Sequence, residues 1–238
     1  MSRTETHVQT LAADTSDSRL ARHGQKMGCC ESLMRAVLGG SSGGGKAEVE
    51  LGGASKNSPT LSETMKGAEI ILQQSSGRPA TLSGSGLALG CAPVEQDSAY
   101  WEATVTTLPP GGTVSLGVSR RPPPDDTSGE LLSRSKLGDG EKTWGFCTSD
   151  GGAAETLKEG DVIGIALDFT DLPMLFFTRG GEPLGEGDEL AVMRIRGTVY
   201  PAFGVGGGAA LSVAFAGGSL AHTPPRKCEA LMVGQDMI

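Results

Sequence analysis

The first 99 residues of the chain contain no Phe, Trp or Tyr, and every aromatic residue lies between Tyr100 and Phe215. Because aromatic side chains dominate the packing energy of protein cores, this absence places the main folding region in the later part of the chain. Long apolar runs are missing as well. No segment reaches the length of a membrane span, and the N-terminus lacks the apolar stretch of a secretory signal.

Basic charge, paired cysteines and histidines are also scarce. The formal net charge is -8, which argues against a nucleic-acid binder because neutralising phosphates requires a basic face. The five cysteines are odd in number and form no C-x-x-C pair, so the sequence supports neither a disulfide framework nor a metal site. This cysteine usage favours a reducing, cytoplasmic compartment. The histidines (His7, His23 and His222) lie outside the expected core, which argues against a Ser-His-Asp triad.

The chain divides into three parts by composition. Residues 1–67 are polar and include the Gly/Ser-rich run 39–45, so they are expected to form a disordered tail and linker. Residues 68–217 carry short alternating runs separated by Gly, Pro and Asp, which indicates an all-β domain. Residues 218–238 form a C-terminal tail that is too short to be a second domain.

Strand signals in the central part follow a period of two. Trp101, Ala103 and Val105 share one face of a predicted strand. The same alternation recurs over 114–118 and 211–215, and residues 161–169 are apolar on both faces, as in a central buried strand. A further run at 175–177 follows after a short break and predicts a hairpin. The series is typical of an antiparallel sandwich or barrel.

Six blocks in order make this region similar to the SPRY domain family. They are Tyr100–Val105, Val114–Ser119, Thr143–Phe146, Glu159–Asp168, the residues Phe176, Gly180, Leu184 and Gly185, and Tyr200–Ala202. The Gly-Asp-Val-Ile-Gly run at 160–164 is the most diagnostic of them. The resemblance implies a bent antiparallel β-sandwich, a concanavalin-like jelly roll, that acts as a non-catalytic protein–protein interaction module without a cofactor. We expect the protein to be a monomer.

The resemblance also implies a partner-binding surface made by loops at one edge of the sandwich. The residues expected there are Arg120, Arg121, Asp125, Asp126, Thr148, Asp150, Gly206 and Gly207. The partner would be a protein or a linear peptide, and the module would serve as an adaptor or scaffold. Where some family members carry an aromatic after the Tyr-Pro-Ala turn, this chain has Gly206-Gly207-Gly208. Trp101 and Trp144 are expected to be core residues, and Asp168 to bond the turn that follows it.

A motif in the tail points to the membrane surface. Met27-Gly28-x-x-x-Ser32 fits the myristoylation pattern, and Cys29 and Cys30 are placed for palmitoylation. One myristoyl chain binds membranes only marginally, so the cysteines would supply the second signal. The motif acts only if synthesis starts at Met27 or cleavage exposes Gly28; otherwise it is a chance match. The predicted location is therefore cytoplasmic, with membrane association where the anchor forms.

Two alternatives remain open on the residues alone. Sandwiches of this shape also occur in glucan hydrolases, whose chemistry needs two carboxylates flanking the scissile bond. The nearest candidate is Glu186-Gly187-Asp188-Glu189, in a Gly-rich turn without the third Glu of that pattern. A carbohydrate-binding protein would instead need aromatic platforms and often a calcium loop, and no Asp/Asn cluster resembles one.

Overall fold

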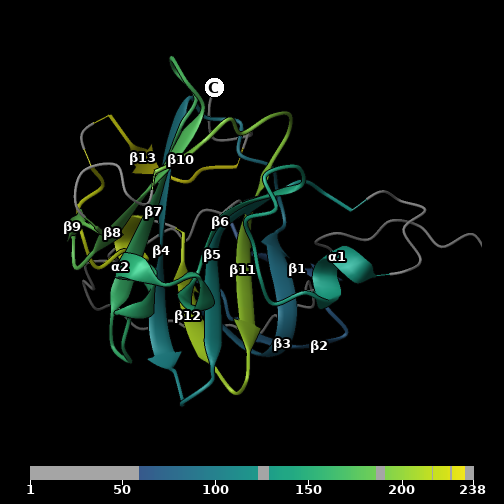
Figure 1. Ribbon diagram of the computed structural model, residues 1–238. Helices are drawn as coiled ribbons and strands as arrows, with labels where there is room; N and C mark the ends of the chain where they lie inside the picture. Colours follow the sequence, from purple (N-terminus) through teal and green to yellow (C-terminus); the bar gives the residue numbers. More distant parts are fainter. Residues whose placement is uncertain (1–58, 123–128, 186–190, 216, 226, 234–238) are drawn as a thin grey trace, which may run out of the picture. The chain divides into compact units, whose positions relative to one another are not determined.

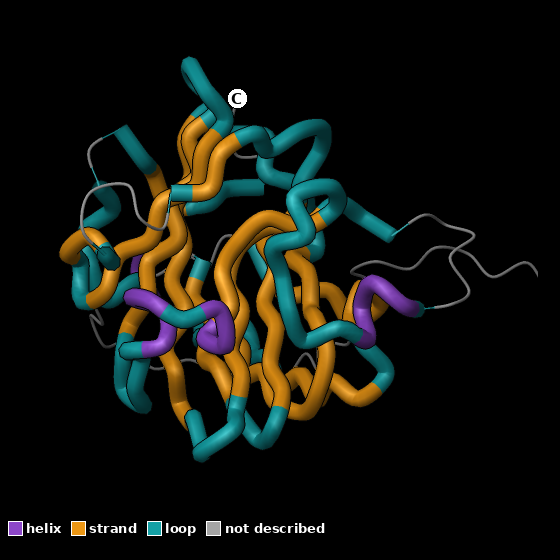
Figure 2. Tube along the Cα trace, in the orientation of Figure 1, coloured by secondary structure: helices purple, strands orange, loops and turns teal. Residues whose placement is uncertain are grey.

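The computed structural model describes residues 59–122, 129–185, 191–215, 217–225 and 227–233. Within them the protein is a bent sandwich of antiparallel strands with only short helical turns (Figures 1 and 2). This confirms the all-β sandwich predicted from the alternating runs. The expected disordered tail falls almost wholly on residues outside the described ranges.

Thirteen strands occur in the described part of the chain. They are β1 (Leu61–Lys66), β2 (Glu69–Gln73), β3 (Ala80–Gly90), β4 (Ser98–Thr107), β5 (Thr113–Ser119), β6 (Thr143–Cys147), β7 (Val162–Asp168), β8 (Met174–Arg179), β9 (Glu182–Pro183), β10 (Val192–Met193), β11 (Tyr200–Gly206), β12 (Ala210–Ala214) and β13 (Glu229–Ala230). The helical turns are α1 (Glu130–Ser133), η1 (Thr148–Asp150), α2 (Gly152–Glu155) and η2 (Gly217–Ser219). Every strand predicted from alternation is present.

The two sheets are joined by the long strand β3, which contributes to both. Its second half pairs with β1 and β11, and the first sheet continues through β5 to β6. Its first half pairs with β2 and β12, and the second sheet continues through β4, β7 and β8 to the short edge strand β10. Strand β7 lies between β4 and β8, as its two apolar faces predicted.

The main core fills the space between the sheets. Trp101 and Trp144 are fully buried, which confirms that both tryptophans are core residues. Phe146 of β6 packs edge-on against Phe177 of β8, with ring centroids 4.6 Å apart. Because β6 and β8 lie near opposite ends of the strand order, this aromatic contact closes the curled sheet on itself.

The sheets extend beyond the range 68–217 on both sides. Strand β1 lies in a segment that the composition marked as loose, yet Leu61 is buried and pairs with Gly90 of β3. At the other side β13 pairs in parallel with β4. Both additions are short and carry few apolar residues, so their strand character comes from pairing with a formed sheet and from the few side chains that they bury.

Candidate functional site

The outer face of the first sheet is covered by a strap, residues 130–139, that crosses in front of the strands (Figure 2). Its side chains Leu131 and Leu137 are buried. Leu137 packs in a small second core with Leu87, Leu89, Tyr200 and Ala202, and Leu132 packs against it. The strap therefore seals apolar side chains that an open sheet face would expose.

Glycines in the sheet let the strap backbone lie close to the strands. A Cβ added to Gly204 of β11 would stand 2.3 Å from the carbonyl oxygen of Ser135, and one added to Gly86 of β3 would stand 2.6 Å from that of Leu132. Real Cβ atoms do not approach backbone oxygens so closely. A larger residue at either position would push the strap away from the sheet.

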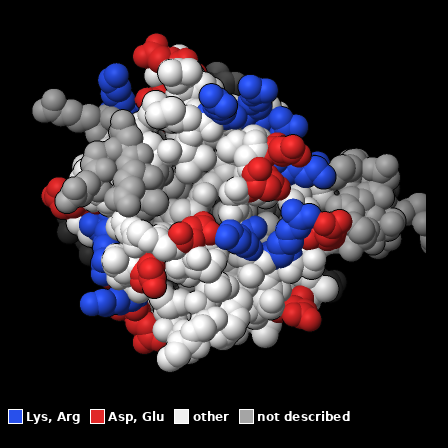
Figure 3. Space-filling model, in the orientation of Figure 1, with Lys and Arg blue, Asp and Glu red and all other residues white. Residues whose placement is uncertain are grey.

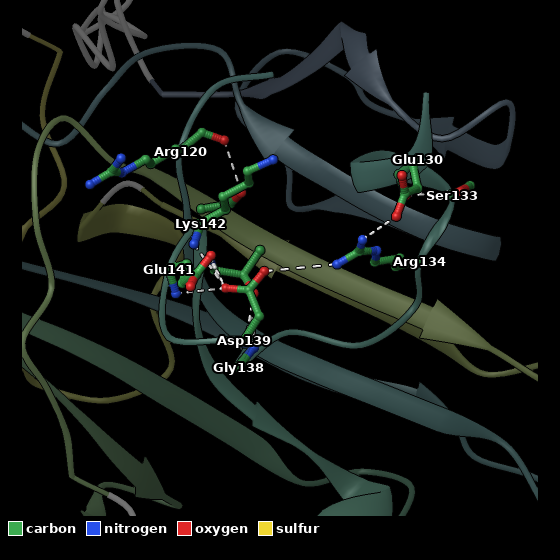
Figure 4. A network of polar contacts seen from close by, with 10 residues as sticks. Arg120, Glu130, Ser133, Arg134, Gly138, Asp139, Glu141 and Lys142 are labelled. Carbon is green, nitrogen blue, oxygen red and sulfur yellow. Dashed lines mark hydrogen bonds and ion pairs between the residues drawn. The ribbon is translucent and has the colours of Figure 1, made fainter. Parts of the chain in front are cut away.

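The strap ends in a turn built around Asp139 (Figure 4). One carboxylate oxygen accepts hydrogen bonds from the backbone N–H groups of Glu141, Lys142 and Thr143, at 2.9, 2.8 and 2.8 Å. Burial by itself would raise the pKa of Asp139, but these donors outweigh it and hold that pKa below its usual value. Arg134 reaches toward the other oxygen and also pairs with Glu130.

One end of the sandwich, here called the Gly207 end, gathers three loops. The turn after β11 closes with the Ala209 N–H bonded to the Gly206 carbonyl, and Gly207 and Gly208 have φ values of 60° and 86°. Two consecutive residues with positive φ require glycine or a close substitute, which explains the glycine run. A Cβ on Gly207 would lie 2.6 Å from the carbonyl oxygen of Gly111, so this turn contacts the turn between β4 and β5.

The third loop of the Gly207 end is η1. The Thr148 hydroxyl accepts a hydrogen bond from the Val114 N–H at 3.1 Å, and Asp150 accepts one from the Cys147 N–H at 2.8 Å. Asp150 also pairs with Lys136 of the strap, and this contact raises the pKa of Lys136. Thr148 and Asp150 thus hold the loop in place, while Ser149 between them is exposed.

The opposite end of the first sheet, here called the Arg120 end, is built from the last residues of β5 and the first of β6 and β11. The Arg120 side chain donates to the carbonyl oxygen of Arg196 at 3.2 Å. Its guanidinium carbon lies 5.7 Å from the centroid of the Trp144 ring, within cation–π range. The Arg120 N–H bonds the Lys142 carbonyl at 2.8 Å. Arg121 follows and is exposed.

The structure divides the predicted partner-binding residues between these two ends. In the register of β5, Thr113 pairs with Gly206, and Ser119 pairs with Tyr200 and Thr143. A strand of seven residues spans about 20 Å. Thr148, Asp150, Gly206 and Gly207 therefore lie together, and Arg120 and Arg121 lie at the far end. Asp125, Asp126 and the acylation residues Gly28, Cys29 and Cys30 lie outside the described residues.

A buried carboxylate on β4 was missed from the sequence. Glu102 accepts hydrogen bonds from the Tyr100 hydroxyl at 2.9 Å, from the backbone N–H groups of Ala221 and His222, and contacts the His222 ring at 3.2 Å. Burial, with a smaller contribution from Glu102, raises the pKa of Tyr100 to about 12. Glu102 thus anchors the C-terminal tail on the second sheet. The available signal was that Glu102 is the one charged residue of β4.

Asp168 has the structural role expected of it. Its carboxylate accepts hydrogen bonds from the Thr170 N–H and hydroxyl, at 2.8 and 2.7 Å, and these bonds lower its pKa. The turn that follows contains Leu172 where glycine would be needed for a positive φ, and Leu172 does not adopt one. Within the described ranges, the non-glycine residues with positive φ are Arg194 and Lys227. Asp168 is therefore a turn residue.

The described residues contain no group of three or more His, Cys, Asp or Glu side chains arranged to hold a metal ion. Among these same residues no helix is long and apolar enough to cross a membrane. A cavity of about 720 Å³ lies beside the β7–β8 turn and the C-terminal tail, lined by residues that include Glu95, Asp97, Asp171 and Lys227.

Comparisons with known proteins place the chain. The SPRY domain family matches residues 98–218, half of the chain. No curated protein sequence shows significant similarity to it. The SPRY domain of human HERC1 is 19% identical, with 65% of this chain and 97% of that domain covered and a TM-score of 0.40. The PSpry domain of TRIM65 is 12% identical, with 67% and 93% covered and a TM-score of 0.41. The protein belongs to the SPRY domain family.

Proposed function

We propose that this protein is a non-catalytic adaptor that binds a partner protein or peptide through the Gly207 end. SPRY domains form a family of protein-interaction modules. The observation that carries the proposal is the convergence there of three loops: 109–112, 148–151 and 206–209. Gly207 and Gly208 are exposed, and glycines allow a partner close access to the backbone.

The rigid mounting of these loops supports the proposal. Thr148 is tied to β5 and Asp150 to both β6 and the strap. Loops held by a scaffold lose little conformational freedom when a partner docks, so more of the contact energy appears as affinity. The 206–208 turn has no aromatic residue. This surface therefore differs from a peptide pocket that is lined by an aromatic side chain at this place. The exposed groups here include backbone, Ser149, Asp150 and Lys136.

The carbohydrate-binding alternative has less support. A sugar platform needs an exposed aromatic face, and all aromatic residues of the chain lie within the described ranges. Eight of them are buried, and Phe169 and Phe176 are half-buried. The carboxylates considered for a glucan hydrolase, Glu186–Glu189, lie outside the described residues. SPRY homologues are generally non-catalytic, which favours the adaptor function.

Affinity capture from the cells that make the protein tests this proposal. Tagged full-length wild-type chain is compared with Ser149→Arg, which places a bulky charge in the exposed η1 loop, and with Ser76→Arg, an exposed control in the β2–β3 connection. We expect wild type and Ser76→Arg to recover the same partner and Ser149→Arg to lose it at an unchanged melting temperature. Recovery of the same proteins by all three forms would contradict docking at the Gly207 end.

A further inference from the structure

The Arg120 end concentrates positive charge in a chain whose formal net charge is -8. Five exposed cations, Arg120, Arg121, Lys142, Arg194 and Arg196, come from three neighbouring segments. Two hydrogen bonds join these segments: the Arg120 backbone N–H donates to the Lys142 carbonyl, and the Arg120 side chain donates to the Arg196 carbonyl. Figure 3 shows basic side chains gathered in the upper right part of the visible face.

These cations carry no ion pairs with the described residues. The Arg and Lys residues that do form ion pairs there are Arg134, Lys136 and Arg179. In the described turn that leads into β6, the acidic residues are Asp139 and Glu141. Asp139 is occupied by three backbone amides and by Arg134, which leaves Glu141 as the exposed carboxylate of that turn. Among the described residues of this end, the cations therefore outnumber the carboxylates.

The cluster is also partly fixed in position. Arg120 is held between the Trp144 ring and the Arg196 carbonyl. Arg194 and Arg196 flank Ile195, which is buried, so the loop that carries them is anchored to the core. A guanidinium that is already ordered loses less freedom when it forms a forked pair with a carboxylate. Met193, next to Arg194, is 49% exposed and offers an apolar contact beside the charges.

We propose that the Arg120 end is a second docking surface, specific for an acidic peptide segment of a partner protein. It lies about 20 Å from the Gly207 end along β5, so one partner can occupy each end. Fixed, planar guanidinium groups recognise individual carboxylates by geometry as well as by charge. A membrane surface would use the same cations only as diffuse charge, and the ordered Arg120 favours the peptide.

A binding assay with the full-length protein tests this surface. The probe is a fluorescent peptide of alternating glutamate and alanine, measured by anisotropy, with glutamine in place of glutamate as the control peptide. We expect the glutamate peptide to bind, the glutamine peptide not to bind, and the affinity to fall as salt is raised, because exposed charges are screened beyond about 8 Å at physiological salt.

Two pairs of substitutions that change the net charge equally separate the site from general electrostatics. Arg121→Glu with Arg196→Glu is expected to weaken binding by roughly tenfold or more. Arg78→Glu with Lys158→Glu, exposed residues away from this end, should leave it nearly unchanged. Arg120→Lys keeps the charge and loses the planar fork, so its affinity for the glutamate peptide should lie between those of the two double variants. Ser149→Arg should bind the peptide as wild type does, even if partner capture at the Gly207 end fails.

Three results would overturn the proposal. The first is equal weakening by both charge-reversal pairs, which would show a non-specific field effect. The second is equal binding of the glutamate and glutamine peptides. The third is binding to vesicles of phosphatidylcholine and phosphatidylserine, lost in the Arg121→Glu/Arg196→Glu variant, without binding to the glutamate peptide. That last outcome would assign the cations to a membrane surface.

Discussion

Trp144 is the largest side chain of β6 and packs in the core. It is 2% exposed, and its indole N–H finds no hydrogen-bond partner among the described residues. Its contribution is therefore packing, with Arg120 lying over the ring. The polar atom adds no stabilising bond that a substitution would remove.

Trp144→Ala is expected to lower the free energy of unfolding by about 3–5 kcal/mol, the usual cost of truncating a large buried aromatic. Trp144→Phe should cost clearly less, since it keeps most of the buried area and loses no hydrogen bond. Urea unfolding of both variants measures the difference. An unchanged midpoint for Trp144→Ala would contradict a core role and move the residue to a binding surface.

Asp139 predicts a pH dependence of stability. A carboxylate with a lower pKa in the folded than in the unfolded state adds stability above its unfolded pKa, and this is lost as the pH falls through the folded pKa. Asp139→Asn should therefore be less stable than wild type at pH 7. This difference in the free energy of unfolding should shrink as the pH falls below about 4. Asp97→Asn, an exposed control, should follow wild type at both pH values. A stability difference between Asp139→Asn and wild type that does not change with pH would show that the charge of Asp139 does not contribute to stability.

At the residue scale the sequence predicted packing better than polar partners. Trp101 and Trp144 could be placed in the core because large aromatics in alternating runs have few other positions. The anchoring role of Glu102 could not be predicted, because its partners Ala221 and His222 lie about 120 residues away in sequence. Long-range contacts of this kind depend on where the tail settles, and local pattern carries no information about that.

Among the elements, the strap is the one whose placement depends on glycines. Gly204→Ala would bring a Cβ to 2.3 Å from the Ser135 carbonyl and 2.8 Å from the Leu87 side chain, so we expect the strap to be displaced. Such overpacking typically costs about 1–3 kcal/mol. Hydrogen exchange should become faster over residues 131–138, with a lower melting temperature. Gly218→Ala is the control, because a Cβ there meets open space. Equal exchange in both variants would contradict the packed strap.

The elements that sequence reasoning recovered are those with strong alternation. Strands β4, β5 and β7 carry Val, Ile, Leu and Trp at every second position or on both faces, and burial follows from that pattern. Strands β1, β2, β3, β11 and β13 were not predicted from alternation, and Tyr200–Ala202, expected as a turn, forms the start of β11. In β1 only the first two residues are buried, and β13 has two residues. Neither strand therefore shows an alternation that can be recognised in the sequence. The separation of Arg120 from Gly206 likewise needs the strand register, which sequence alone did not supply.

For the whole molecule, the acylation motif at Gly28, Cys29 and Cys30 predicts a dependence on the start site. A protein beginning at Met27 presents Gly28 for myristoylation, and two acyl chains anchor more firmly than one, because each buried methylene adds about 0.8 kcal/mol. Membrane fractionation and myristate labelling should detect the Met27 form. Gly28→Ala should abolish both signals, and Cys29→Ser with Cys30→Ser should weaken only membrane retention. A wholly soluble, unlabelled Met27 form would show the motif to be a chance match.

The proposed adaptor function implies that the loops at the Gly207 end contact the partner. Hydrogen–deuterium exchange of the full-length chain, alone and with a captured partner, tests it most directly. We expect slower exchange in the partner complex over residues 109–112, 148–151 and 206–209, where the three loops meet. Strands of the core should be unchanged. Protection confined to other surfaces, with these loops exchanging as in the free protein, would contradict it.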